Sequence, residues 1–466
     1  MNRRRLLQAG AAGIAAAGLP HPVPAAEPVK FPRGFLWGTA TSSYQVEGRG
    51  DRQADSIWDT FCRLPGTIHD RSSGEVADDS YHRYAEDVAL IAGAGLKAYR
   101  FSVSWPRVLP DGTGRPDPKG LDYYSRVVDT AQKAGIEPWV CLYHWDLPQA
   151  LQDKGGWNNR GIADWFSDYA RLMAERLGDR VARWVMLNEP SVVAVIGNGY
   201  GEHAPGFKSR DKMFAAMHHQ NLAQGRALAT LRELGGGRFK LGTVLSLQPV
   251  RPTDHSDANR HAAEMWDALW NRAFLNPLFQ GRYPALIEPY VAPLMQPDDL
   301  RQIRQPVDYL GVNYYSPMYQ RADANGLVGT NWGAPPPGTK TTAMGWPIDP
   351  AALYELLLDL RGNYGNPTIY ITENGACFLD HPGPDGRIDD ADRIAFLHDH
   401  ILICRKAISA GVDLRGYFAW SILDNFEWAW GYTRPFGLVA VDRATLKRTP
   451  KASYAWLSRV AHANAA

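Results

Sequence analysis

Eight short apolar segments, with helical patterns between them, constrain the fold of this chain more than any other feature. Near-continuous apolar runs of this kind are typical of strands buried on both faces, as in a parallel sheet. The predicted strands are residues 35–40, 98–105, 137–145, 183–190, 240–247, 308–316, 368–375 and 414–423. The clearest helical patterns, with apolar residues three and four positions apart, are residues 81–98, 121–135 and 165–179.

These alternating units predict the fold class. Eight strand–helix units in a chain of 466 residues indicate an α/β protein with a single (β/α)8 TIM barrel and long loops, over residues 26–466. Two doubly wound domains are the alternative, but they require a linker. The segments richest in proline and glycine, 110–120 and 331–340, are better interpreted as surface loops within units.

The first 25 residues have the pattern of a signal peptide. Arg3–Arg5 precede a weakly apolar stretch of fourteen residues, Leu6–Leu19, and Val23–Ala25 is a suitable cleavage site. The adjacent arginines favour the twin-arginine export route. An ordinary secretory signal or an uncleaved anchor is the alternative, although the stretch is short for a membrane span. We therefore expect an exported protein, periplasmic or secreted, that is free of the membrane after cleavage.

Composition and charge limit the classes of partner that the chain is expected to bind. The chain is 45% hydrophobic and 21% charged, as in soluble globular proteins, and its net charge is +1. There is no basic stripe and no nucleic-acid motif, so no nucleic-acid partner is predicted. The sequence leaves open whether the protein forms a homo-oligomer.

No cofactor and no catalytic metal is predicted either. The adjacent pair His218 and His219 lacks the spacing of a helical zinc site, and we assign it to helix packing. The cysteines form no C-x-x-C pair, which argues against a zinc ribbon. A disulfide among them remains possible. The four are Cys62, Cys141, Cys377 and Cys404.

Polar and aromatic residues concentrate at the ends of the predicted strands, where the active sites of TIM barrels lie. Two of them, Glu189 and Glu373, are carboxylates at corresponding places on strands four and seven. Hydrolysis of a glycosidic bond requires one protonated carboxyl group and one ionised carboxylate, with pKa values pushed apart by their surroundings. Arg100 on the second strand is expected to favour ionised Glu373. Pro190 is expected to hold Glu189 in an extended backbone.

Several of these segments together resemble glycoside hydrolase family 1, the β-glucosidase type. They are FLWGTATSSYQVEG, YRFSVSWPRVLP, LYHWDLPQAL, WVMLNEP, YITENG and YFAWSILDNFEWAWGYTRPFGLVAVD, which follow the family order over nearly the whole mature chain. The resemblance implies a retaining enzyme with Glu373 as nucleophile and Glu189 as acid and base. Its two carboxyl groups should lie about 5–5.5 Å apart.

The resemblance also implies the remaining site residues. Those that hold sugar hydroxyls would be Gln45, His144, Asn188 and Glu427, with Trp428 beside them and Trp420 as the aromatic floor. Trp346 would belong to the aglycone site, and Phe436 would help to close the glycone pocket. Those that position Glu373 and tune its charge would be Arg100, Asn313 and Tyr315, and Trp145 would support the site. The family carries a cis peptide bond that corresponds to Trp420–Ser421.

The resemblance narrows the substrate to a small-molecule β-glycoside. Glu427 replaces the phosphate-binding block of members that take 6-phosphorylated sugars, so we expect a neutral glycone. Glu189 stands where thioglucosidases have Gln, so we expect O-glycosides. Terminal, non-reducing β-D-glucosyl residues of short β-glucosides are the predicted substrate. Galactosides, fucosides, transglycosylation and the identity of the aglycone remain open. A non-catalytic sugar-binding protein is disfavoured because both carboxylates are present.

Overall fold

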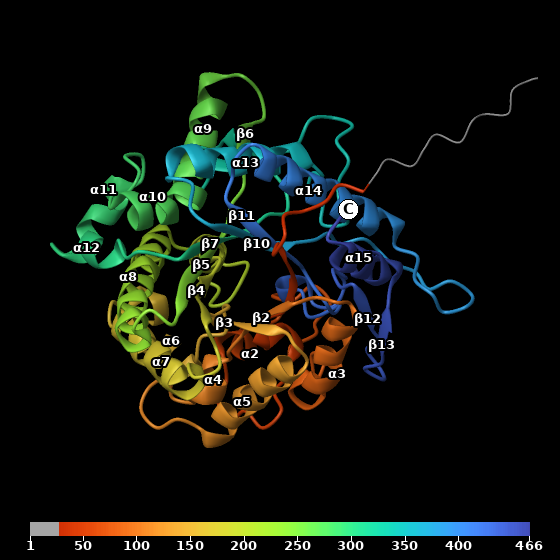
Figure 1. Cartoon of the computed structure of the whole chain (residues 1–466). Helices are drawn as coiled ribbons and strands as arrows, with labels where there is room; N and C mark the ends of the chain where they lie inside the picture. The colour runs from red at the N-terminus through yellow and green to blue at the C-terminus, as the bar shows by residue number, and fades with distance from the viewer. Residues whose placement is uncertain (1–27) are drawn as a thin grey trace, which may run out of the picture.

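The computed structural model describes residues 28–466, and the predicted signal peptide lies outside the described residues. Eight parallel strands close into a barrel in which each strand pairs with the next along the barrel and β1 pairs with β11 (Figure 1). The strands are β1 (Leu36–Ala40), β2 (Ala98–Ser102), β3 (Glu137–Tyr143), β4 (Arg183–Asn188), β5 (Lys240–Ser246), β7 (Tyr309–Asn313), β10 (Ile369–Asn374) and β11 (Leu414–Ala419). All eight fall within the predicted segments, so the predicted (β/α)8 barrel is confirmed.

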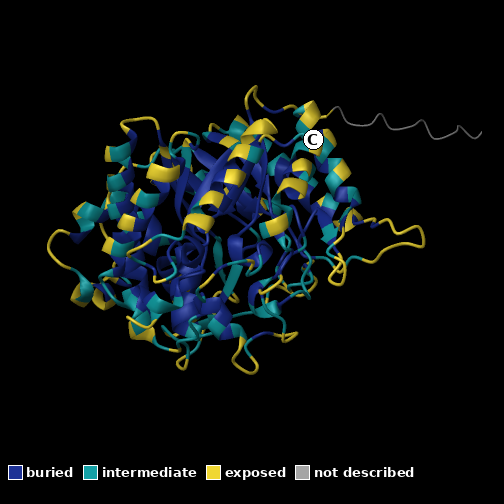
Figure 2. Ribbon diagram, turned by 90° about the horizontal axis from the view of Figure 1, so that it is seen from below, coloured by how far each residue is buried: buried dark blue, intermediate teal, exposed yellow. Residues whose placement is uncertain are grey.

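Helices surround this barrel, and their exposed positions face outward, while the strands are buried (Figure 2). The longest are α3 (Ser80–Gly93), α5 (Pro118–Lys133), α7 (Ile162–Leu177), α8 (Arg210–Gly235), α9 (Asp257–Asp267), α13 (Pro350–Asn363), α14 (Ala391–Ser409) and α15 (Ala452–Ala463). Within residues 28–466, no helix is long and apolar enough to cross a membrane.

Short elements occupy the loops. The short α-helices are α1 (Ser43–Val46), α2 (Ile57–Cys62), α4 (Trp105–Val108), α6 (Gln149–Gln152), α10 (Ala273–Gln280), α11 (Glu288–Val291) and α12 (Asp299–Ile303). The 3-10 and π helices are η1 (Gly156–Asn158), η2 (Val192–Tyr200), η3 (Ala268–Arg272), η4 (Ala292–Leu294) and η5 (Trp428–Trp430). The strands outside the barrel are β6 (Val250–Pro252), β8 (Met318–Ala322), β9 (Thr330–Trp332), β12 (Val439–Val441) and β13 (Arg448–Pro450).

Local sequence explains where the helices begin and end. The side chain of Asp117 accepts a hydrogen bond from the backbone N–H of Lys119 at the start of α5, where Pro118 occupies the first turn. Glycine follows α5 in the left-handed region, at Gly135 with φ +72°. Gly178, the C-cap of α7, has a right-handed φ of −72°. Glycine is needed there for close packing, because a Cβ atom would lie 2.6 Å from the ring of Phe239.

Aromatic side chains fill the interior of the barrel. The ring of Trp139 on β3 lies 5.0 Å from Tyr309, 4.8 Å from Tyr370 and 4.9 Å from Phe418, which come from the distant strands β7, β10 and β11. The barrel is therefore a packed core rather than a channel. A packed core fixes the strands, and the side chains at their carboxyl ends are held on rigid supports.

Candidate active site

Glu189 and Glu373 meet in one cavity at the carboxyl ends of the strands. Glu373 belongs to β10, and Glu189 directly follows the last residue of β4. Glu189 is 6% exposed and Glu373 is 3% exposed, and both line a cavity of about 430 Å³. Two largely desolvated carboxyl groups that face the same space cannot ionise independently of each other.

Glu373 has the surroundings of an ionised carboxylate. The guanidinium of Arg100 forms an ion pair with its Oε1, and the hydroxyl of Tyr315 donates a hydrogen bond of 2.5 Å to its Oε2. Burial raises the pKa of Glu373 above its ordinary value, while Arg100 and the Tyr315 hydroxyl act in the opposite direction. The sequence prediction that Arg100 lies beside Glu373 is confirmed.

Among residues 28–466, no cation forms an ion pair with the carboxyl group of Glu189. Burial, together with the charge of Glu373, raises the pKa of Glu189 to about 8. Asn313 donates a hydrogen bond of 2.8 Å to Glu189 Oε1, and it also lowers the pKa of Glu373, so it serves both carboxyl groups rather than Glu373 alone. The ion pair with Arg100 favours the ionised form at Glu373, while burial and the neighbouring charge favour the protonated form at Glu189.

The backbone of Glu189 differs from the sequence prediction of an extended conformation. Its φ is +49°, in the left-handed region. The residue before a proline is excluded from the right-handed helical region, and Pro190 opens the turn from β4 into η2. The left-handed conformation avoids the helical region that Pro190 disfavours and also allows the chain to turn from β4 into η2. The N–H of Glu189 remains bonded to Val244 O on β5 at 2.9 Å, which anchors the turn to the sheet.

Most predicted site residues line the cavity beside the two carboxylates. They are His144, Trp145, Tyr315, Trp346, Trp420, Glu427, Trp428 and Phe436. The rings of Trp145 and Trp428 lie 4.5 Å apart, and Trp346 lies 5.5 Å from Tyr315. The peptide bond Trp420–Ser421 is cis, as expected. The wall of the cavity is therefore largely aromatic, as in sites that bind sugar rings against flat apolar faces.

Four predicted residues lie behind this wall instead of in it. They are Gln45, Arg100, Asn188 and Asn313, all completely buried. Asn188 Oδ1 accepts a hydrogen bond of 2.9 Å from Arg100, and its amide nitrogen lies 3.0 Å from His144 Nε2. Burial holds the pKa of His144 well below its ordinary value, so the imidazole is neutral. Asn188 thus connects Arg100 with His144, and its contact with a sugar hydroxyl stays a prediction.

Sequence reasoning missed the loop residues of the cavity wall. They include His203, Gln248, Trp270, Met318 and Trp332. Trp332 lies in the segment 331–340, which the sequence assigned to a surface loop, and its ring packs 4.6 Å from that of Tyr200. The tryptophan inside that polar, proline-rich loop was the available signal for a contact with the cavity, because a large aromatic side chain contributes little to stability when it is exposed to solvent.

The histidine pair and the cysteines lie outside this site. His218 Nε2 lies 2.9 Å from Asp299 Oδ2, and His219 Nδ1 lies 2.9 Å from Trp157 O, so both are packing residues of α8. Residues 28–466 contain no cluster of side chains suited to a metal ion. The four cysteines, all within these residues, are free thiols. Burial raises the pKa of Cys141 and of Cys377 to about 12, which makes both inert.

The model of the family described as "Glycosyl hydrolase family 1" matches residues 27–466. The chain belongs to glycosyl hydrolase family 1. Beta-glucosidase A of Thermotoga maritima is 45% identical over 93% of this chain and 98% of that protein. The bifunctional beta-D-glucosidase/beta-D-fucosidase of Bifidobacterium breve is 42% identical over 92% and 97%. The family 1 resemblance seen in the sequence is confirmed, and the protein is a glycoside hydrolase.

Solved structures of family 1 agree with this assignment. The family 1 β-glucosidase of Thermotoga maritima in complex with isofagomine lactam superposes with a TM-score of 0.90, at 45% identity, over 94% of this chain and 100% of that chain. The same enzyme in complex with deoxynojirimycin gives a TM-score of 0.89 at 45% identity, over 93% and 99%. This one relative therefore binds both isofagomine lactam and deoxynojirimycin.

The pKa of Glu189 predicts the alkaline limb of the pH profile. An acid catalyst must be protonated, so kcat/KM on an alkyl β-glucoside should fall about tenfold per pH unit above a pKa of about 8. In Glu189→Gln, measured on 2,4-dinitrophenyl β-glucoside, this limb should vanish. Burial also raises the pKa of Glu427 to about 8. A limb that survives in Glu189→Gln would assign the titration to Glu427 and contradict the prediction.

Proposed function

We propose that this family 1 enzyme removes terminal, non-reducing β-D-glucosyl residues from short β-glucosides with retention of configuration. One observation carries the proposal. Two carboxyl groups share a buried cavity. Within the described part of the chain, Glu373 but not Glu189 is paired with a guanidinium, and the pKa of Glu189 is raised to about 8. Such unequal surroundings assign one group as nucleophile and the other as acid.

The proposed reaction is a double displacement. The ionised oxygen of Glu373 attacks the anomeric carbon, and Glu189 gives its proton to the departing glycosidic oxygen. The resulting glycosyl ester is then attacked by water, from which Glu189, now a carboxylate, removes a proton. The ester bond breaks and Glu373 returns to its ionised form. Tyr315 and Arg100 hold the carboxylate of Glu373 in place through both steps.

Glu427 supports a neutral glucosyl group as the glycone. It lies in the cavity wall as a buried carboxyl group, where a charged form would repel a phosphate and accept hydrogen bonds from sugar hydroxyls. Relatives named "1,4-beta-D-glucan glucohydrolase", from Thermotoga neapolitana, support β-linked glucose oligomers as substrates. The Bifidobacterium breve relative, named for two activities, favours β-fucosides as a second substrate class.

We propose in addition that the protein is exported by the twin-arginine route and is released from the membrane after cleavage. The support is the sequence of residues 1–25, with Arg3–Arg5 before the apolar stretch. Replacing all three arginines by lysine keeps the charge but removes the twin-arginine signature. The variant should accumulate uncleaved in the cytoplasm of a bacterial host, as judged by cell fractionation and intact mass. Unchanged export of the lysine variant would contradict the route.

Removing the nucleophile should abolish turnover. Glu373→Ala should lower kcat on 4-nitrophenyl β-glucoside by at least about 10³-fold. Azide fits the space left by the carboxylate and attacks from the same face, so it should restore part of the activity and yield the α-glucosyl azide. The anomeric configuration is read from the proton NMR spectrum of the product. A β-azide, or the same α-azide from the wild type, would refute the role of Glu373.

Removing the acid should make the rate depend on the leaving group. Glu189→Ala should lower kcat/KM for alkyl β-glucosides by about 10²–10⁴-fold, because their alkoxide must be protonated as it departs. The 2,4-dinitrophenolate leaving group departs without a proton, so kcat/KM for the 2,4-dinitrophenyl glucoside should fall far less. Steady-state kinetics on both substrates provides the comparison, with Asn221→Ala on α8 as a control for substitution of a buried residue. Equal losses on the two glucosides would disprove the assignment.

A further inference from the structure

Gln45 is one of the predicted sugar-binding residues, yet its side chain is completely buried behind the cavity wall. Its Oε1 accepts a hydrogen bond of 2.7 Å from the hydroxyl of Ser42. Its Nε2 donates to Asn425 Oδ1 at 3.0 Å and to Phe426 O at 2.9 Å. The same Nε2 lies 3.5 Å from Glu427 Oε2. The amide of Gln45 is thus placed directly behind Glu427.

Asn425 continues this contact as a directed series of hydrogen bonds. Its Nδ2 donates to Ser421 Oγ at 3.2 Å and to Leu423 O at 3.1 Å. The hydroxyl of Ser421 in turn donates to the backbone carbonyl of Ala40 at 3.1 Å. The series therefore runs from Ser42 through Gln45, Asn425 and Ser421 to the end of β1.

The direction of the series follows from its last members. A backbone carbonyl only accepts, so Ser421 must donate to Ala40 and accept from Asn425. The carbonyl of Leu423 imposes the same orientation on the Asn425 amide. The amide nitrogen of Asn425 is therefore already used as a donor, so its Oδ1 must accept the hydrogen bond from Gln45 Nε2. The side-chain amides, which can otherwise be turned end for end, have one orientation here.

We propose that Asn425 is a positioning residue: it fixes the orientation of the Gln45 amide so that Nε2, and not Oε1, lies beside the glycone-binding carboxyl group of Glu427. The inference rests on the proposed function, because it assigns Glu427 to sugar recognition. Asn425 is only 5% exposed and Ser421 and Gln45 are fully buried, so a broken bond is not replaced by bulk water. Members of such a buried series also strengthen one another.

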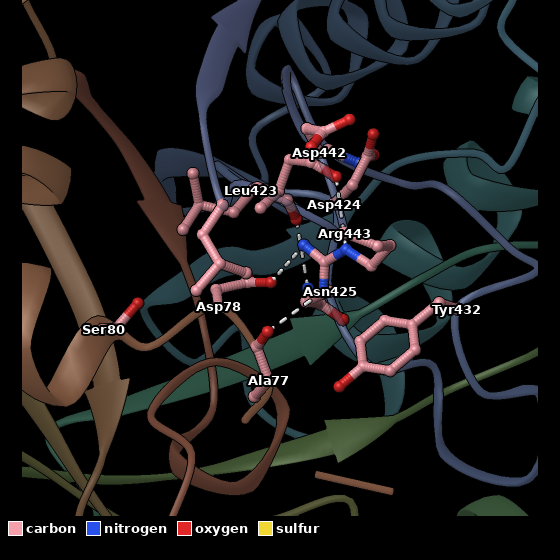
Figure 3. A network of polar contacts seen from close by, with 12 residues as sticks. Ala77, Asp78, Ser80, Leu423, Asp424, Asn425, Tyr432, Asp442 and Arg443 are labelled. Atoms are coloured by element: carbon pink, nitrogen blue, oxygen red, sulfur yellow. Dashed lines mark hydrogen bonds and ion pairs between the residues drawn. The ribbon is translucent and has the colours of Figure 1, made fainter. Parts of the chain in front are cut away.

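The backbone of the segment that contains Asn425 is also held by contacts that do not involve the Asn425 side chain. Figure 3 shows Arg443 directed toward Ala77 and Asp78, in the same view as Leu423 and Asn425. Arg443 donates to Ala77 O at 3.1 Å and to Asp78 Oδ1 at 2.7 Å, and its guanidinium lies 4.6 Å from the ring of Tyr432. The N–H of Asp424 donates to Val439 O on β12, and the N–H of Val439 donates to Ile422 O, both at 2.9 Å, so the backbone of this segment is held independently of the Asn425 side chain.

This independent support makes a side-chain test possible. Asn425→Ala should lower kcat/KM for 4-nitrophenyl β-glucoside about tenfold, mainly through a higher KM, because one buried hydrogen bond to the recognition group is lost. It should also change the ratio of kcat/KM for the β-glucoside to that for the matching β-galactoside. Ser421→Ala, which cuts the series one bond further away, should shift both quantities in the same direction by less.

Asn221→Ala is the matched control. Asn221 is a buried asparagine on α8 that donates to Ala273 O and to the Tyr283 hydroxyl, away from the cavity. Its replacement should lower the unfolding temperature but leave KM and the sugar ratio at wild-type values. Folded Asn425→Ala and Ser421→Ala with wild-type KM and ratio would overturn the positioning role. A folded wild type inactive on both glycosides would instead refute the proposed function.

Discussion

The buried ion pair between Arg100 and Glu373 is the interaction on which the site depends. Two charges without exposure to water are stable only when each neutralises the other and the remaining polar atoms are bonded. Arg100 meets most of this condition: it also donates to Asn188, which lies 3.0 Å from His144, and of its nitrogens only Nε lacks a partner among the described residues. One guanidinium on β2 thus sets the charge of the nucleophile and the position of the opposite wall. Loss of either partner would leave an uncompensated charge in the middle of the barrel.

The catalytic rim also contains unusual backbone. Trp145, Glu189 and Trp428 all have positive φ values, which residues with a Cβ atom rarely adopt. Such conformations cost about 1–3 kcal/mol each and are maintained by the surrounding structure. Here the support is visible: the indole N–H of Trp145 donates to Asn188 O at 2.9 Å, and the N–H of Glu189 is bonded to β5. The packed barrel below provides the rigidity that keeps these three residues in place.

The strands and the two carboxylates were predictable because both follow from short-range rules. The strand Ile369–Asn374 begins with an apolar run and is buried throughout, and a parallel barrel collects all carboxyl ends at one rim. Residues such as His203 and Gln248 were not predictable, since long loops reach the cavity through tertiary packing that no local pattern encodes. The backbone of Glu189 was misjudged because the proline rule excludes one conformation without choosing between the others.

Because its four cysteines are free thiols, the fold does not depend on the redox state of the compartment. Cys404, like Cys141, is fully buried, and its thiol lies inside the apolar core. Burial raises the pKa of Cys62, the most accessible of the four, to about 11, so little of it is in the reactive thiolate form. Neither oxidation nor reduction of these sulfurs is needed to complete the fold. The chain can reach its final shape in a reducing cytosol and keep it in an oxidising space, without help from enzymes that make or rearrange disulfides.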